Sequence, residues 1–179
     1  MNSNSNYQHN QQILQNIENL FQHALAKHNK VFFVRFDVSF PEHEIYVNPS
    51  PLISNFNESL IRYFKRKKLD PYYLWVREQK TSLNPHYHFI MLFDGNKIQH
   101  SYSVHIKAEQ LWNKQLKLPE NNKGLIDYCN KYSNGVMIYR NDSGSYEDAA
   151  NWASYLSKID DKNINAEFRS QGMSNLKLN

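Results

Sequence analysis

Two histidines one residue apart, His86 and His88, stand at the start of a run of apolar residues, 89–93. Successive side chains of a strand point to opposite faces, so the two imidazoles share one face if this run is a strand. Neutral imidazoles side by side can hold one divalent cation. Two buried histidines hydrogen-bonded to the backbone are the alternative interpretation.

Two histidines leave a hard cation under-coordinated, and Glu78 is the candidate for the missing carboxylate. If residues 72–80 and 86–93 form a hairpin, Glu78 lies opposite His86. A register shift of one residue would send Glu78 to the other face, and a solvent-facing glutamate paired with nearby cations is the alternative. Two histidines and one carboxylate suit Mg²⁺ or Mn²⁺ on a phosphate better than structural zinc.

A tyrosine that could act as a nucleophile, Tyr155, lies in a predicted helix at residues 145–159. It flanks the apolar stripe of that helix together with Asn151 and Lys158. A half-packed ring with its hydroxyl in a cleft is oriented to attack, and a lysine ammonium one turn away favours the phenolate. A tyrosine that only packs at an interface is the alternative. Tyr146, nearly opposite on the helix, is a poorer candidate.

A basic cluster at residues 62–68 precedes several aromatic residues. Cations that follow a phosphate backbone, combined with rings on which bases stack, are typical of single-strand binding. Arg62, Arg66 and Lys67 are therefore candidate phosphate contacts. A solvated helix face is the alternative.

Hydrophobic periodicity predicts the elements that must position these residues. In the first predicted strand, 31–40, polar and apolar residues alternate toward the C-terminal end, which puts Arg35, Asp37 and Ser39 on one side. The central order of strand, helix, strand, strand, helix, strand predicts an α+β fold of the ferredoxin-like, split βαβ type with a mostly antiparallel sheet. The histidine strand is apolar on both faces, which is typical of a central strand. The predicted helices are 11–28, 55–68, 104–116 and 145–159, and the predicted strands are 31–40, 72–80, 86–93, 125–129 and 136–139.

The predicted domain organisation is a polar tail and amphipathic helix at 1–30, a catalytic domain at 31–160 and a polar tail at 161–179. A chain of 179 residues is long enough for one well-buried domain. A net charge of +4 suits a polyanionic partner. The single cysteine, Cys129, excludes an internal disulfide and a cysteine-based zinc site. No apolar run reaches about 20 residues and no signal-peptide pattern is present, so we expect a soluble cytoplasmic protein without a membrane partner.

The combination of motifs resembles the HUH endonuclease superfamily, in particular the inovirus-type (filamentous-phage) replication initiators. The resemblance rests on PHYHF at 85–89, WVRE at 75–78 and YLSK at 155–158. Residues 35–41 resemble the first strand of that family, so the likeness spans about 31–160. Each motif is short, and their order and separation carry the specificity.

The resemblance implies a function. His86 and His88, with Glu78, would bind Mg²⁺ or Mn²⁺, and Tyr155 would attack a DNA phosphate. Attack would leave a 5′-phosphotyrosyl link and a free 3′-hydroxyl, while Lys158 would position the phosphate or the metal. The expected activity is a single-strand nick that starts rolling-circle replication of a phage or related mobile element.

The implied partners are single-stranded DNA at a replication origin and host replication proteins. Many phage initiators of this superfamily carry two tyrosines on the nucleophile helix, whereas Tyr155 has no partner at a four-residue spacing. Resolution of the strand would therefore need something else, such as a second subunit. The oligomeric state stays open at this point.

Other functions are compatible with the same residues. A transposase or relaxase would use the same chemistry. A non-catalytic nucleic-acid-binding regulator could share the sheet without the reaction. A metal-dependent phosphodiesterase acting on nucleotides would use His86 and His88 with water in place of Tyr155.

Overall fold

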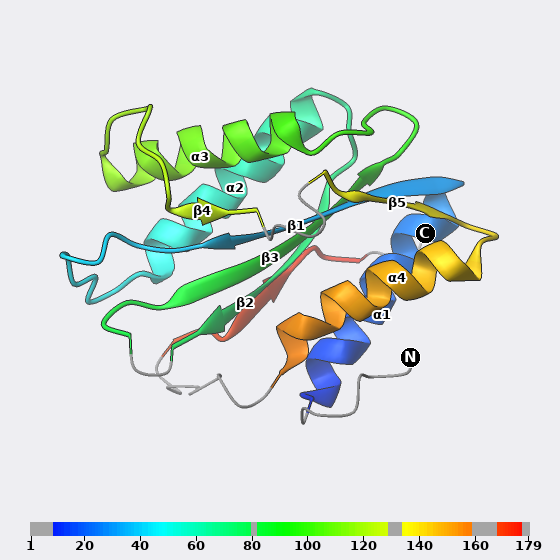
Figure 1. The fold of residues 1–179 in the computed structure, drawn as a ribbon, viewed down its shortest axis with the longest axis horizontal. Coiled ribbons are helices and arrows are strands. Elements are labelled where there is room, and N and C mark those ends of the chain that lie inside the picture. The colour runs from blue at the N-terminus through cyan, green and yellow to red at the C-terminus, as the bar shows by residue number, and fades with distance from the viewer. Residues whose placement is uncertain (1–8, 80–81, 129–133, 159–167, 177–179) are drawn as a thin grey trace.

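The computed structural model describes residues 9–79, 82–128, 134–158 and 168–176 (Figure 1). Four α-helices and six strands lie within these residues. The helices are α1 (Gln11–Lys27), α2 (Ser50–Arg66), α3 (Tyr102–Leu116) and α4 (Ser143–Ser154), and a 3-10 turn, η2 (Tyr155–Ser157), follows α4. The strands are β1 (Lys30–Val38), β2 (Tyr72–Glu78), β3 (His86–Asp94), β4 (Ile126–Asp127), β5 (Val136–Tyr139) and β6 (Gln171–Met173).

The strands form one sheet in the order β4-β1-β3-β2-β6, and β5 pairs with the other end of β1. Every pairing is antiparallel. Strand β3 lies between β1 and β2, which are joined through α2, and this is the split βαβ unit. The predicted ferredoxin-like α+β fold is confirmed.

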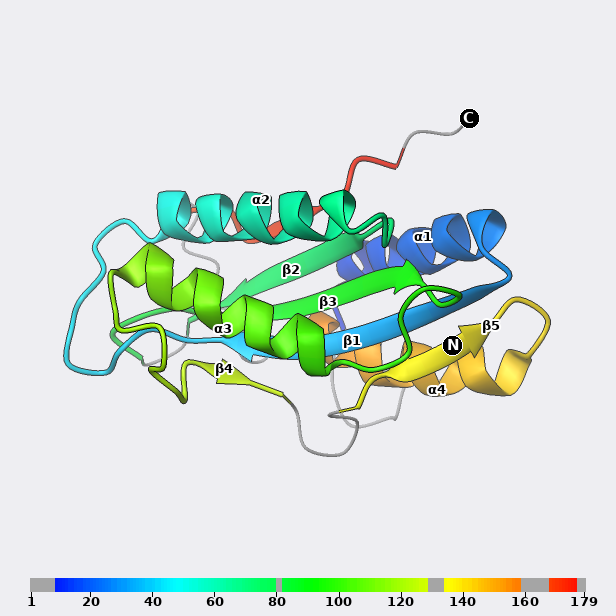
Figure 2. The same ribbon diagram turned by 90° about the horizontal axis from the view of Figure 1, so that it is seen from above.

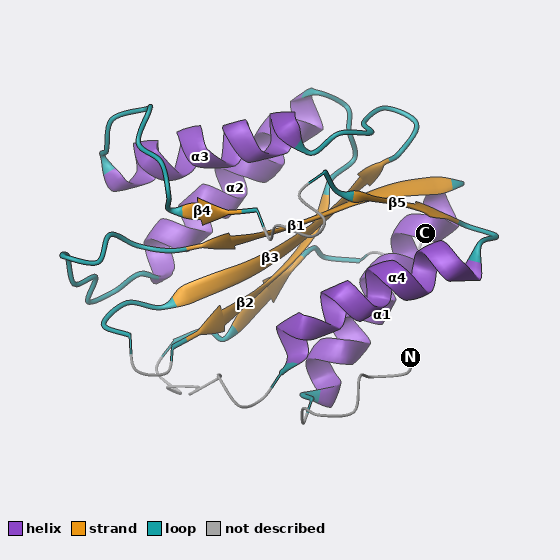
Figure 3. Cartoon of the chain, viewed as in Figure 1, coloured by secondary structure: helices purple, strands orange, loops and turns teal. Residues whose placement is uncertain are grey.

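Helices cover both faces of the sheet, as Figures 2 and 3 show. Helices α2 and α3 pack on one face and α1 and α4 on the other. Because side chains alternate along a strand, Phe89 and Met91 of β3 face α2 and α3, while Ile90 and Leu92 face α1 and α4. The histidine strand is therefore a central strand buried on both sides, as predicted.

Helix α1 belongs to the same core as the sheet. Its apolar residues recur every three or four positions and are buried against the sheet and α4. The side chain of Asn10 accepts a hydrogen bond from the amide of Ile13 (3.2 Å), which satisfies one of the free amides at the helix start. None of the helices in the described residues is long and apolar enough to cross a bilayer.

Several elements differ from the predictions. Helix α2 begins at Ser50, five residues earlier than predicted. Strand β1 ends at Val38, two residues earlier than predicted. Helix α4 ends at Ser154, so Tyr155 lies in the 3-10 turn, and the predicted end of that helix at Ile159 lies outside the described residues. Strand β6 falls within the predicted C-terminal tail, because three residues that include a glycine carry no periodic signal.

Gly172 allows β6 to lie against the ring of Trp75. A Cβ atom at this position would come within 2.5 Å of the Trp75 side chain. We expect Gly172→Ala to lower the free energy of unfolding by roughly 1–3 kcal/mol, as overpacking does elsewhere. Chemical denaturation measures the change. Gly144→Ala is the control, since a Cβ there meets only a carboxylate oxygen at 3.4 Å, and an equal loss in both variants would contradict the packing argument.

Candidate active site

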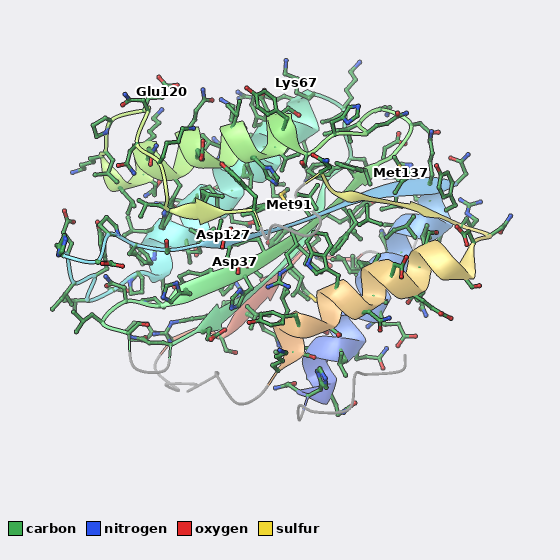
Figure 4. The ribbon with its side chains drawn as sticks, in the orientation of Figure 1. Asp37, Lys67, Met91, Glu120, Asp127 and Met137 are labelled. Carbon is green, nitrogen blue, oxygen red and sulfur yellow. The ribbon has the colours of Figure 1, made fainter. Side chains whose placement is uncertain are left out.

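Polar side chains gather on the α1 and α4 face, where β1 and β2 end and β3 begins. The strand register places Asp37 opposite His88, and Glu78 opposite His86. Cross-strand partners share a face, so these four side chains and Arg35 project from the same side of the sheet. The predicted pairing of Glu78 with His86 is confirmed. Figure 4 shows Asp37 close to Asp127, its register partner on β4.

His88 lies between two carboxylates. Its Nε2 is 2.5 Å from Oε2 of Glu78, and its Nδ1 is 2.8 Å from Oδ1 of Asp37. The first contact is a hydrogen bond. The second is an ion pair, because His88 Nδ1 and Asp37 Oδ1 have no hydrogen bond of good geometry within the described residues. The imidazole is buried, so both contacts act in a medium of low polarity.

These contacts set the protonation of His88. Burial acts to lower the pKa of His88, but the carboxylates of Asp37 and Glu78 outweigh burial and raise its pKa above the usual value. Without a metal, His88 is therefore an imidazolium over a wider pH range than a histidine in water.

A raised pKa predicts how stability depends on pH in the presence of a chelator. The stabilisation that the His88 proton provides is fully present below about pH 6.5, the ordinary pKa of histidine, and is lost as the pH rises through the raised pKa of the folded state. We expect the melting temperature of the wild type to fall toward that of His88→Gln between pH 6.5 and the alkaline range. Thermal unfolding of both proteins in EDTA tests this, and a gap that widens with pH would contradict it.

Tyr155 lies directly against this group. Its ring is 5.8 Å from the imidazole of His88, at an interplanar angle of 86°. The Arg35 guanidinium is 4.2 Å and the Lys158 ammonium 4.1 Å from the ring centroid. The side chain is 39% exposed, so the phenol contacts the site and still reaches solvent. The structure thus brings His88, Glu78, Tyr155 and Lys158 together, four of the predicted site residues.

The turn that carries Tyr155 is fixed by the segment before α1. The amide of Asn10 donates to the carbonyl of Ser157 (2.7 Å), and Nδ1 of His9 is 2.5 Å from the Ser157 hydroxyl. Ser157 in turn donates to the carbonyl of Ser154 (2.6 Å). His9 also forms a β-bridge with Lys158. Residues just before α1 therefore hold the position of Tyr155 and Lys158.

Arg35 is a site residue that sequence reasoning did not select. It is 6% exposed, and its Nε has no hydrogen-bond partner within the described residues. Its nearest acidic group, Oδ2 of Asp37, is 3.7 Å away. A buried guanidinium with an unsatisfied donor is suited to bind an anion such as a phosphate. The alternation that puts Arg35 and Asp37 on one side of the strand was the available signal.

His86 takes a different position from His88. Its side chain is exposed, and its Nε2 is 3.5 Å from the Ser82 hydroxyl. In this conformation the described residues contain no group of three or more His, Cys, Asp and Glu side chains placed to hold a metal.

The donor set nevertheless fits a hard divalent cation. Glu78 already points at Nε2 of His88, and His86 stands opposite Glu78 with an exposed ring that can turn. Imidazole nitrogen and carboxylate oxygen are ligands of Mn²⁺ and Mg²⁺. Asp37 would contact the other ring nitrogen of His88 and orient the imidazole, as carboxylates commonly do for metal-bound histidines.

The predicted phosphate contacts lie elsewhere. Arg62 and Arg66 line a groove between α2, β2 and the segment around β6, and Arg62 is paired with Glu58. Lys67 does not line this groove, and its ammonium lies 5.9 Å from the Tyr63 ring. Helix α2 covers the opposite face of the sheet from Tyr155.

Comparisons with known proteins identify the family. No curated protein and no solved structure matches the chain. The family model described as the YagK/YfjJ C-terminal domain matches residues 1–174. This match spans nearly the whole chain and includes every residue of the candidate site. The chain belongs to the YagK/YfjJ C-terminal domain family.

Proposed function

We propose that the chain is a metal-dependent endonuclease that nicks single-stranded DNA and starts rolling-circle replication of a phage or related mobile element, with Tyr155 as the nucleophile. The observation that carries the proposal is the contact of the Tyr155 ring with His88, Arg35 and Lys158 on one face of the sheet.

The chemistry follows from these side chains. The Tyr155 phenol gives up its proton to water, its oxygen attacks a DNA phosphorus to form a new O–P bond, and the bond from phosphorus to the 3′-oxygen breaks. The 3′-oxygen takes up a proton and leaves as a hydroxyl, and the protein stays on the 5′ end. Arg35 and Lys158, whose cations lie against the Tyr155 ring, bind the phosphate oxygens, where negative charge develops in the transition state.

Glu78, His86 and His88 would hold the cation, and Asp37 would orient His88. A bound Mg²⁺ or Mn²⁺ would polarise a phosphoryl oxygen. Holding the cation requires the loss of the His88 proton that Glu78 now shares, so cation binding should strengthen as the pH rises.

The second candidate is a non-catalytic regulator that binds nucleic acid. The observation that favours it is the contact of both His88 nitrogens with carboxylates, which compensate the charge of the imidazolium without a metal. A transposase or relaxase shares the first cut and differs only in the later steps.

Labelled single-stranded oligonucleotides that tile both strands of the element encoding the chain test the proposal. Each oligonucleotide is labelled at the 5′ or the 3′ end and incubated with Mn²⁺ or with EDTA. We expect one oligonucleotide to transfer its 3′ label to the protein, with Mn²⁺ only. The matching 5′-labelled fragment should be shorter and extendable by a polymerase.

The outcomes separate the candidates. Metal-dependent cleavage without transfer of label would identify water as the nucleophile and a phosphodiesterase. Binding without cleavage across the whole tiling would identify the regulator. Transfer of the 5′ label would mean attack with the opposite polarity, and each of these three results would overturn the proposal.

A further inference from the structure

A basic groove of about 840 Å³ lies on the face of the sheet opposite Tyr155. One wall is α2, with Arg62, Lys65 and Arg66, and the other wall includes Arg169, just before β6. The three cations on α2 recur at three- and four-residue spacing and share one exposed side of the helix. The groove therefore presents positive charge from both walls.

Few carboxylates oppose this charge. The two acidic residues that line the groove are Glu58, which is paired with Arg62, and Asp70, which is paired with Lys27 and His28. Both are neutralised by groups of the chain itself. The charge that remains is positive and available to an external anion.

The positive surface continues beyond the groove. An adjoining pocket of about 360 Å³ shares Lys65 and Asp70 with it and adds Lys27, Lys68 and Lys97. The two together carry seven lysine and arginine side chains against two lining carboxylates, and a third carboxylate, Asp94, pairs with Lys97 (3.1 Å), whereas the whole chain has a net charge of only +4. The excess positive charge of the chain is thus concentrated here, which is typical of a surface that contacts nucleic acid.

The floor of the groove indicates how it would bind. The Trp75 ring is buried and lies against Gly172, its partner on the neighbouring strand β6, and the Arg169 guanidinium is 5.8 Å from that ring. Tyr73 is the least buried of the three β2 rings that line the groove. With so little aromatic surface open for base stacking, contacts would be to phosphates and would carry little sequence preference.

The groove is also separate from the candidate active site. Tyr73 and Trp75 of β2 face α2, whereas Glu78 faces α1 and α4. Five residues of strand separate Tyr73 from Glu78, a length of about 17 Å. A strand in the groove would therefore lie several nucleotides from the phosphate next to Tyr155.

We propose that this groove is a second DNA-binding surface, which holds the phosphate backbone away from the cleavage position and provides most of the sequence-independent affinity. The choice of DNA over another polyanion rests on the proposed function. The binding itself does not depend on the reaction.

Fluorescence anisotropy with a labelled 30-nucleotide DNA, single-stranded or annealed to its complement, tests the groove. The variant Arg66→Gln/Arg169→Gln removes one charge from each wall, and Lys114→Gln/Lys117→Gln removes two exposed charges from the end of α3 as a matched control. For the wall variant we expect roughly tenfold weaker binding and a salt slope smaller by about 1.4 with single-stranded DNA. The control should bind within about twofold of wild type.

Equal binding by the wall variant and wild type, or an equal loss in the control, would overturn the proposal. If Arg169→Gln prevents folding, Lys65→Gln/Arg66→Gln, which changes two exposed side chains of the α2 wall, tests the same groove. Of single-stranded and double-stranded DNA, the natural ligand of the groove is the one to which the wall variant loses more affinity.

The two proposals fail in different ways. Tyr155→Phe should bind the probe as tightly as wild type, so the groove can be correct even if no covalent product exists. Conversely, a groove variant with unchanged affinity would leave the nucleophile test unaffected.

Discussion

Replacing Tyr155 by phenylalanine is expected to abolish covalent attachment of DNA, with a loss of roughly 10⁴-fold or more in the rate of cleavage. Only the hydroxyl is removed. The contacts of the ring with His88, Arg35 and Lys158 are made by its face and edge, which phenylalanine retains. The variant should therefore fold and bind DNA like wild type. Denaturing gels with a 3′-labelled oligonucleotide measure the loss.

Two other tyrosines provide the controls. Tyr102 is 74% exposed at the start of α3. Tyr146 lies in α4, the helix that precedes the turn with Tyr155, and packs edge-on against Phe21 of α1, with the ring centroids 5.8 Å apart. Tyr102→Phe and Tyr146→Phe should keep full activity. If Tyr155→Phe formed as much DNA–protein adduct as wild type, or if either control lost the adduct, a different group would be the nucleophile.

Replacing Arg35 by methionine is expected to lower the cleavage rate by roughly 10²–10³-fold, as removal of one group that stabilises transition-state charge does elsewhere. Its guanidinium is buried beside the Tyr155 ring and has an Nε without a hydrogen-bond partner in the described part of the chain. The terminal nitrogens of the guanidinium would bind a phosphate oxygen next to Tyr155. Single-turnover cleavage at saturating DNA separates this effect from binding.

Arg35→Lys is the informative companion variant. Lysine keeps the charge but not the planar set of donors, so it should recover only part of the rate. DNA affinity should change by less than tenfold in both variants, because the groove on α2 provides most of the affinity. Full activity in Arg35→Met would show that Arg35 does not stabilise the transition state.

Local patterns were sufficient to predict the fold and one pairing within the site. Alternation along β3 identified a strand buried on both faces, and the order of elements identified the split βαβ unit. The hairpin placed Glu78 opposite His86, because a short connection determines the register of two adjacent strands.

The rest of the site depends on contacts between distant parts of the chain. The pairing of Asp37 with His88 follows from the register of β1 against β3, which no turn connects. The position of Tyr155 depends on the bonds of His9 and Asn10 with Ser157, nearly 150 residues away in sequence. No periodic pattern encodes such contacts. Asp37 and Arg35 could be placed on one face from the sequence, but not beside His88 and Tyr155.

Mapping the DNA-linked residue by mass spectrometry tests the central claim most directly. The protein is incubated with Mn²⁺ and the intact oligonucleotide that it cleaves in the tiling experiment. It is then digested with nuclease and protease, and the peptides are fragmented to locate the attached nucleotide. We predict a 5′-nucleotide phosphate on Tyr155. A nucleotide on any other residue, or a cleaved strand with a free 5′-phosphate and unmodified protein, would contradict the assignment of Tyr155 as the nucleophile.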